Sequence, residues 1–294
     1  MTFDLSCTDA TFPRLSERGA LQVIADLGIP FVDICVFGGY ELHFAPEEVV
    51  SEPAASARKA KQLVESVGLR VADVFCASDF AATAVNHPDA GFRARLRDDF
   101  QSIVEFAISV NATGITLLPG VPWPDEDERV SRARAAEELQ WRAELAKGAT
   151  LKLSIEPHYE SIVPTPQTAL ELLEHAPDLM ITLDYAHFVY QGIPEREVDV
   201  LISRTRHIQA RQGAPGLMQA RQEEGVIDFA RIIRAFAAAG YDGFFSLEYT
   251  WEPWLDMKNV DTIAESAYLR DLFLATRREI TGSGVGMSEK AQKE

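Results

Sequence analysis

Cysteine is scarce in this sequence, and the few cysteines form no pattern. Cys7, Cys35 and Cys76 are the only three in 294 residues, each lies in an apolar segment, and none belongs to a CxxC pair. An odd number of widely spaced cysteines argues against a disulfide framework and against a cysteine-based zinc site. We therefore expect reduced thiols and a cytoplasmic location.

Positive charge and long apolar runs are also lacking. The chain has 28 basic against 45 acidic residues, a net charge of −17, and no run of Lys or Arg. Such a surface repels phosphate backbones, which argues against a nucleic-acid partner. No segment approaches the roughly 20 apolar residues needed to cross a membrane, and the N-terminus lacks the features of a signal peptide.

The sequence instead alternates short apolar segments with longer amphipathic ones. The apolar segments have the length of strands, and the amphipathic ones have the period of helices. Strand followed by helix, repeated eight times without a break in composition, predicts a parallel sheet. The expected strands are 2–7, 31–37, 70–76, 113–120, 151–156, 179–184, 206–211 and 243–248, and the expected helices are 16–28, 52–68, 92–111, 129–148, 165–176, 194–201, 228–240 and 261–279.

Eight such units in 294 residues predict an α/β fold, namely a closed (β/α)8 TIM barrel in a single domain. An open, doubly wound parallel sheet is the alternative. No GxGxxG follows any expected strand, so the dinucleotide-binding form of that sheet has no local support. We place the barrel at residues 1–280 and expect the small, polar stretch 281–294 to be a flexible C-terminal tail.

Polar side chains occupy one face of each of four strands in the second half. Successive side chains of a strand point to opposite faces. In these strands one face is apolar and suits helix packing, whereas the other is polar. The polar faces carry Lys152, Ser154, Glu156 and His158 on one strand, Thr182 and Asp184 on the next, His207, Gln209 and Arg211 on the third, and Ser246 and Glu248 on the last.

These polar faces predict a metal site. Sites of TIM barrels lie at the C-terminal ends of the strands, so Glu156, Asp184, Gln209 and Glu248 are expected to converge there. Three carboxylates in a pocket of low dielectric constant repel one another, and a divalent cation between them removes that repulsion. Any one of these carboxylates alone could instead cap a helix or form a surface ion pair. We expect His207 to be a hydrogen-bonding core residue rather than a ligand.

The motifs LSIEPH, LDYAH, HIQARQ and GYDGFFSLE resemble the xylose isomerase-like barrel superfamily of sugar isomerases and epimerases. The resemblance extends over most of the chain and is strongest in these motifs. It implies that Glu156, Asp184, Gln209 and Glu248 bind one divalent metal. Ketose 3-epimerases of the superfamily usually have H-x-H where this chain has His207-Ile208-Gln209, and the Gln form resembles hydroxypyruvate isomerase instead.

The resemblance also implies contacts with substrate. His187 matches the His of the family's D-x-x-H element, and Arg211 lies near a family Arg that binds substrate. His158 would help to line the mouth of the barrel. Trp251 and Trp254 stand near the expected rim, where they could pack on a sugar or simply anchor a loop.

Three carboxylates and one amide supply only oxygen ligands, which favour Mn²⁺ or Mg²⁺ over Zn²⁺. The superfamily also includes apurinic endonucleases, which use several zinc ions and many histidines. The acidic composition and the six histidines of this chain argue against that activity.

The resemblance implies a divalent-metal-dependent isomerase or epimerase of a small sugar or hydroxy-ketone. Glu156 and Glu248 would remove and return a proton next to a carbonyl, with a metal-stabilised enediolate between the two steps. A lyase on the same scaffold is the alternative, such as a keto-cyclitol or dehydroshikimate dehydratase or a 3-keto-glycoside eliminase. A barrel that only binds carbohydrate is a third hypothesis. The expected partner is a small carbohydrate, with no nucleic acid, no membrane and a possible homo-oligomer.

Overall fold

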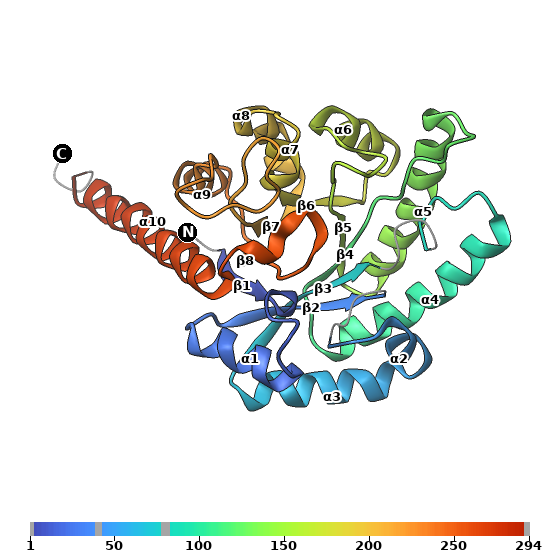
Figure 1. The fold of residues 1–294 in the computed structure, drawn as a ribbon, viewed down its shortest axis with the longest axis horizontal. Coiled ribbons are helices and arrows are strands. Elements are labelled where there is room, and N and C mark those ends of the chain that lie inside the picture. Colours follow the sequence, from blue (N-terminus) through green and yellow to red (C-terminus); the bar gives the residue numbers. More distant parts are fainter. Residues whose placement is uncertain (1–2, 39–42, 78–82, 291–294) are drawn as a thin grey trace.

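Eight parallel strands form a closed barrel in the order of the sequence (Figure 1). The structure is a computed structural model that describes residues 3–38, 43–77 and 83–290. The first and last strands pair with each other and close the sheet, so the barrel has no exposed edge. The predicted (β/α)8 TIM barrel in a single domain is thereby confirmed, and the open doubly wound sheet is not what the chain forms.

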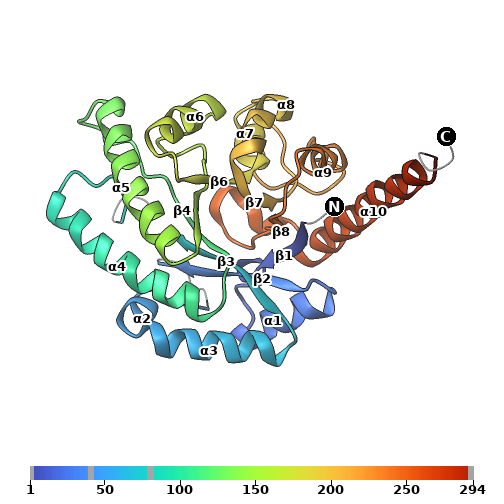
Figure 2. The same ribbon diagram turned by 180° about the vertical axis from the view of Figure 1, so that it is seen from behind.

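The strands are short and each is followed by at least one helix (Figure 2). The strands are β1 (Asp4–Thr8), β2 (Phe31–Phe37), β3 (Arg70–Ala77), β4 (Gly114–Leu117), β5 (Lys152–Ile155), β6 (Met180–Asp184), β7 (Thr205–Ala210) and β8 (Phe244–Leu247). The α-helices are α1 (Glu17–Asp26), α2 (Pro46–Ser51), α3 (Pro53–Ser66), α4 (Ala90–Ser109), α5 (Glu128–Gly148), α6 (Pro166–His175), α7 (Tyr185–Tyr190), α8 (Glu195–Val198), α9 (Phe229–Ala238) and α10 (Thr262–Lys290). Short 3-10 turns are η1 (Asp9–Thr11), η2 (Asp199–Arg204) and η3 (Trp254–Asn259).

Helix ends follow local sequence signals. The Ser16 hydroxyl accepts a hydrogen bond from the Gly19 amide and caps α1, and Gly28 ends this unit with a φ of +72°, which glycine adopts without strain. Thr165 forms a capping box with Thr168 at the start of α6.

The apolar core lies between the outer face of the barrel and the helices. Along β2, Val32 and Ile34 point outward into this core, whereas Asp33 between them points into the barrel and reaches β7. The facing surface of α3 repeats small and branched residues at Ala57, Ala60 and Val64, the spacing of one helix face. This alternation leaves the barrel interior free to be polar.

A bulge in β7 turns two successive side chains into the barrel. Ile181 pairs with Thr205 and the next residue of β6 pairs with His207, so Arg206 is the extra residue. Strict alternation of side chains would have pointed Arg206 away from the barrel interior. The bulge turns it inward, so the alternation predicted for this strand is wrong at Arg206. Arg206 donates hydrogen bonds to Ser154 Oγ, Asp73 Oδ2 and Thr116 Oγ1, each at 3.0 Å, and all these groups are buried.

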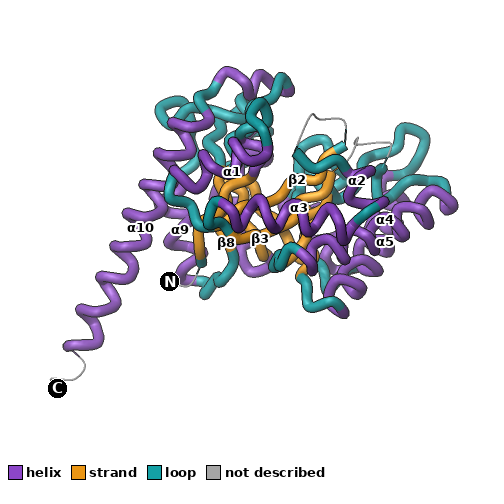
Figure 3. Tube along the Cα trace, turned by 90° about the horizontal axis from the view of Figure 1, so that it is seen from below, coloured by secondary structure: helices purple, strands orange, loops and turns teal. Residues whose placement is uncertain are grey.

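The last helix, α10, extends away from the barrel beyond α9 (Figure 3). It was expected to end at residue 279 but continues to Lys290, and residues 291–294 lie outside the described part of the chain. The division into a barrel at 1–280 and a flexible tail at 281–294 stays a prediction. Within the described residues, none of the helices has both the length and the apolar character needed to cross a membrane.

The close approach of Arg206 to β4 gives a prediction about stability. A Cβ at Gly114 would lie 2.5 Å from Arg206 Nη1 and 2.5 Å from the Lys152 carbonyl oxygen. Because the backbone cannot easily yield, Gly114→Ala is expected to lower the free energy of unfolding by about 1–3 kcal/mol. Urea denaturation measures this value. Gly148→Ala is the matched control, since a Cβ there meets nothing within 4 Å; equal stability of the two variants would contradict the prediction.

Candidate active site

The ends of four neighbouring strands bring the expected site residues to one mouth of the barrel. Glu156 follows β5, Asp184 ends β6, Gln209 lies in β7 and Glu248 follows β8. These strands pair in sequence order, and the four side chains are all buried. The expectation that they lie on one end of a parallel barrel therefore agrees with the geometry.

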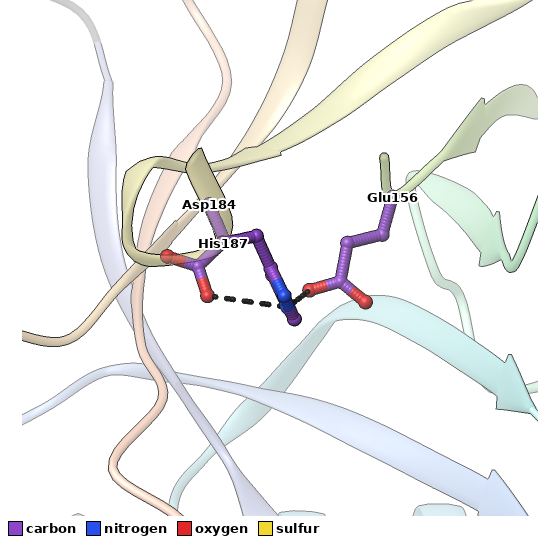
Figure 4. Close-up of side chains that lie close together, drawn as sticks. All are labelled: Glu156, Asp184 and His187. Carbon is purple, nitrogen blue, oxygen red and sulfur yellow. Dashed lines mark hydrogen bonds and ion pairs between the residues drawn. The ribbon is translucent and has the colours of Figure 1, made fainter. Parts of the chain in front are cut away.

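Glu156, Asp184 and His187 form a compact group (Figure 4). His187 Nε2 lies 3.2 Å from Glu156 Oε1 and 3.7 Å from Asp184 Oδ2. One ligand atom from each residue lies within 4.8 Å of the others, close enough for one metal ion. The sequence predicted His187 as a substrate contact, and the structure places it within the group that could hold the metal.

Local structure fixes the direction of the Asp184 carboxylate. Asp184 is the N-cap of α7, and its Oδ1 accepts a hydrogen bond from the Ala186 amide at 2.8 Å. The cap leaves Oδ2 directed toward His187 and Arg211. Since His187 lies in the first turn of the same short helix, the sequence D-x-x-H sets both groups at the mouth.

Gln209 and Glu248 form the second half of the site. Gln209 Nε2 donates to Glu248 Oε1 at 2.9 Å, which orients the amide. Gln209 Oε1 and Glu248 Oε2 are then buried with no hydrogen-bond partner among the described residues. A buried acceptor without a partner costs about 1–3 kcal/mol. Two such acceptors on hydrogen-bonded neighbours are suited to binding an electropositive ligand.

Arg211 joins the two halves. Its Nη2 lies 2.7 Å from Asp184 Oδ2, 3.1 Å from His187 Nε2 and 3.8 Å from Glu248 Oε2. The sequence predicted Arg211 as a residue near the rim that holds substrate oxygens. The structure places its guanidinium among the carboxylates, where it acts as a cation between them, and the contact with substrate stays a prediction.

Burial governs the charges of the site. It raises the pKa of Glu156 and raises that of Glu248 well above its usual range, although Arg211 opposes both shifts. It lowers the pKa of His187 to about 3. Burial alone would lower the pKa of Arg211, but the surrounding carboxylates, Asp184 first, raise it.

His187 Nε2 faces incompatible demands. An arginine can only donate hydrogen bonds, so Nε2 must accept from Arg211 and carry no proton. The same single lone pair also faces Glu156 Oε1, while Nδ1 is buried without a hydrogen-bond partner among the described residues. These groups therefore gain from a bound ligand that reorganises them.

The donor set fits a divalent cation. Carboxylate and amide oxygens predominate, with one imidazole nitrogen close to them. Arg211 stands in for such an ion by neutralising Asp184 and Glu248. Binding of a metal to all four predicted ligands requires this guanidinium to move from between the two carboxylates.

The other residues predicted to contact substrate lie at different depths. The His158 ring centre is 5.7 Å from that of His187. The Arg14 guanidinium stacks on the Trp251 ring, 4.9 Å from its centre. Trp254 packs on Tyr159, and its ring centre lies 6.4 Å from that of His187.

Sequence reasoning did not include Asp33, which lies beneath the site. The Asp33 carboxylate accepts from Ser246 Oγ and lies 2.7 Å from His207 Nε2, below Gln209 and Glu248. Burial opposes ionisation of Asp33, but His207 outweighs it and lowers its pKa. This contact agrees with the expectation that His207 is a hydrogen-bonding core residue. An acidic residue inside the apolar strand FVDICVF was the available signal.

The fold and this site define a class of protein. The model of the xylose isomerase-like TIM barrel family matches residues 21–272, which is most of the chain. The chain therefore belongs to the xylose isomerase-like TIM barrel family, as its motifs suggested.

Three individual proteins illustrate its similarities. A 2-oxo-tetronate isomerase of Pectobacterium atrosepticum is 26% identical over 184 residues, 55% of this chain and 68% of that protein. The structure of D-psicose 3-epimerase with D-tagatose from Clostridium cellulolyticum H10 has a TM-score of 0.74 at 15% identity, covering 93% of this chain and 99% of that one. A xylose isomerase-like TIM barrel protein from Mycobacterium smegmatis, in complex with magnesium, has a TM-score of 0.70 at 14% identity, covering 94% and 98%. The relatives support an enzyme, and the structural similarities establish the fold.

The position of Arg211 gives a prediction about the metal-free protein. Arg211→Met leaves Asp184 and Glu248 without their cation, so we expect the free energy of unfolding of the metal-free protein to fall by about 3–5 kcal/mol. Added Mn²⁺ is expected to stabilise this variant more than the unchanged protein. Urea denaturation with and without Mn²⁺ measures both effects. Arg234→Met, which breaks an exposed pair with Glu279, is the control and should cost about 1 kcal/mol or less. An Arg211 variant as stable as this control would contradict the role of Arg211 as an internal cation.

Proposed function

We propose that the protein is a divalent-metal-dependent isomerase or epimerase of a small sugar or hydroxy-ketone. The observation that carries this proposal is the group of Glu156, Asp184 and His187, with the unpartnered oxygens of Gln209 and Glu248 beside it. The family and the isomerase relative support the same class of reaction.

Glu156, Asp184, Gln209 and Glu248 would hold the metal. A bound divalent cation would polarise the carbonyl and hydroxyl oxygens of the substrate and so make the neighbouring C–H bond more acidic. The oxygen-rich donor set favours Mn²⁺ or Mg²⁺ over Zn²⁺. The imidazole nitrogen His187 Nε2 also lies near these oxygens, and we assign it to substrate, as the family motif implies.

Glu156 and Glu248 are the proposed proton carriers. They come from β5 and β8, with the Asp184 and Gln209 strands between them, so they approach the mouth from two sides. Both are buried, and a carboxylate that burial has made more basic removes a carbon-bound proton more readily than an exposed one. Return of the proton to the opposite face of the same carbon would invert that carbon. Return to the neighbouring carbon, with a hydroxyl proton moving from one oxygen to the other, would move the carbonyl.

The remaining side chains orient the substrate. Arg211 and His187 present hydrogen-bonding nitrogens at the level of the carboxylates, and His158 borders them. Once displaced from Asp184, the Arg211 guanidinium has donors for substrate oxygens. Trp251, and with it Trp254, would cover the C–H faces of a sugar and exclude water. A cytoplasmic location and a homo-oligomer stay predictions.

Glu156→Gln and Glu248→Gln test the proton transfer. Each amide keeps the shape of the side chain but cannot accept a carbon-bound proton, so we expect turnover to fall by at least about a hundredfold. Exchange of solvent deuterium into ketoses, followed by mass spectrometry, measures it, and circular dichroism checks the fold. Glu174→Gln, an exposed change on α6, is the control. Full activity in either site variant would refute the assigned roles.

The products of the same assay separate the isomerase from a lyase. A lyase begins with the same proton abstraction and then expels a leaving group, so an enone absorbance or a released aglycone would favour it. Deuterium incorporation without such a product supports the isomerase or epimerase. If the protein shows no deuterium exchange and holds no metal, carbohydrate binding is the one hypothesis of the three that remains.

Gln209→Leu tests the amide ligand directly. The change removes the unpartnered Oε1, and we expect Mn²⁺ affinity to fall by about tenfold or more. Calorimetric titration of the protein after chelation gives the dissociation constant. Gln167→Leu, on the surface of α6, should leave it unchanged. Equal affinities for the two variants would remove Gln209 from the ligand set.

A further inference from the structure

A further acidic side chain, Glu252, lies near the carboxylates of the candidate site. It stands in the loop between β8 and η3, four residues after Glu248, and is half-buried. Burial raises the pKa of Glu252, Arg211 lowers it, and Glu156 raises it further. The charges of the site therefore act on Glu252, although the proposed ligand set does not include it.

Arg211 has unused hydrogen-bond donors where it lies. Its Nη2 lies against the Asp184 carboxylate, whereas its Nη1 donates to Met257 Sδ at 3.8 Å. A thioether sulfur is only a weak acceptor. Arg211 Nε is buried with no hydrogen-bond partner among the described residues. The guanidinium therefore keeps two nitrogens with which it could bind a second carboxylate.

A short series of contacts leads from Arg211 to Glu252. Met257 Sδ, which Arg211 Nη1 contacts, also lies 3.9 Å from Thr250 Oγ1. The Thr250 hydroxyl in turn donates to Glu252 Oε1 at 3.4 Å. Within the described part of the chain, no basic side chain forms an ion pair with Glu252. Its carboxylate is therefore free to pair with a cation that approaches from the site.

The loop that carries Glu252 is fixed by hydrogen bonds. Gln219 Nε2 donates to the carbonyl oxygens of Thr250 and Met257, each at 2.9 Å, and its Oε1 accepts from the Thr250 amide. Between these two points the chain doubles back through Leu255, whose φ of +49° is strained for a leucine. The fold thus holds Glu252 close to Arg211 despite this local strain.

A metal ion would need the place that Arg211 now holds between Asp184 and Glu248. Two cations facing the same buried carboxylates repel each other, so the guanidinium has to turn away. It then needs another carboxylate, because a buried charge without a counter-charge is costly. Three of the four carboxylates that most raise the pKa of Arg211 are proposed metal ligands, and the fourth is Glu252.

We propose that Glu252 is the second counter-ion of Arg211 and positions its guanidinium when a divalent cation occupies the candidate site. Arg211 pairs with Asp184 in the metal-free protein and with Glu252 in the metal-loaded protein. This inference rests on the metal binding of the proposed function and not on its reaction. Glu252 is thus a positioning residue, which favours metal binding by stabilising the displaced guanidinium and keeps its donors near the substrate.

Glu252→Gln tests this role through the affinity for Mn²⁺. Glutamine keeps the shape of the side chain but has no charge for the displaced guanidinium, so we expect the Mn²⁺ dissociation constant to rise about tenfold. Calorimetric titration of the chelated protein measures it. Asp256→Asn is the matched control, because it removes one exposed charge from the same loop and asparagine tolerates a φ of +59°. This control should change the constant less than about twofold.

The Arg211→Met background separates pairing with the guanidinium from a general attraction of cations. Without Arg211, Glu252 has no guanidinium to hold, so Glu252→Gln should change the Mn²⁺ dissociation constant less than about twofold there. Equal weakening in both backgrounds would overturn the proposal, because Glu252 would then act on the metal itself. The absence of any weakening in the unchanged background would also overturn it.

A crystal structure of the Mg²⁺-loaded protein tests the same movement without any substitution. We expect a nitrogen of the Arg211 guanidinium within about 4 Å of a Glu252 carboxylate oxygen, the usual limit for an ion pair. A guanidinium that stays on Asp184, or that turns into solvent, would contradict the proposal even if the Arg211→Met variant does not fold.

Deuterium exchange into ketoses distinguishes this proposal from the proposed function. If the Mn²⁺ affinities behave as expected but no ketose exchanges, the proposed reaction fails and the role of Glu252 stands. If ketoses exchange but Glu252→Gln weakens Mn²⁺ binding equally in both backgrounds, the reaction stands and the role of Glu252 fails. A protein that binds no Mn²⁺ would overturn both.

Discussion

The mouth of this barrel depends on a balance of buried charge. Glu156, Asp184 and Glu248 are carried on strands whose pairing holds them together, and burial denies them the solvent that would screen their repulsion. The structure balances them with Arg211, whose Nη2 lies 2.7 Å from Asp184 Oδ2. A divalent cation would balance them better, because it can bind several oxygens at once. Arg211 thus balances the site without a metal, and the proposed function adds a divalent cation to the same group of side chains.

A second charged layer inside the barrel supports the first. Arg206 reaches across the interior to Asp73, and the Asp33–His207 contact lies between this layer and Gln209. Buried pairs of this kind contribute little net stability, but removal of one partner leaves the other charge buried without a counter-charge. Their effect is to fix the positions of the strands, and so to hold the amide of Gln209 at a set depth under the mouth.

The sequence predicted the barrel and the strand positions of the site residues. Where its predictions were incomplete, the physical reasons can be identified. Strand alternation and unit count predicted the barrel, and polar residues at strand ends predicted that Glu156 and Glu248 share its mouth. Alternation could not predict that Arg206 turns inward, because a bulge depends on the register with β6. Nor could it place Arg211 between two carboxylates, since side-chain rotamers respond to the charges that the fold assembles. Residues in strands were thus easier to place than the ends of long, flexible side chains.

The two sides of the mouth differ in chemistry, and this difference follows from the order of the units. Strands β5 to β8 end in acids, an amide and a guanidinium, whereas on the other side Cys35 of β2 and Phe75 of β3 form a small apolar cluster with Ala10. His158, at the end of β5, stands at the boundary. The proposed reaction therefore depends on the half of the mouth formed by β5 to β8, where the candidate metal ligands lie.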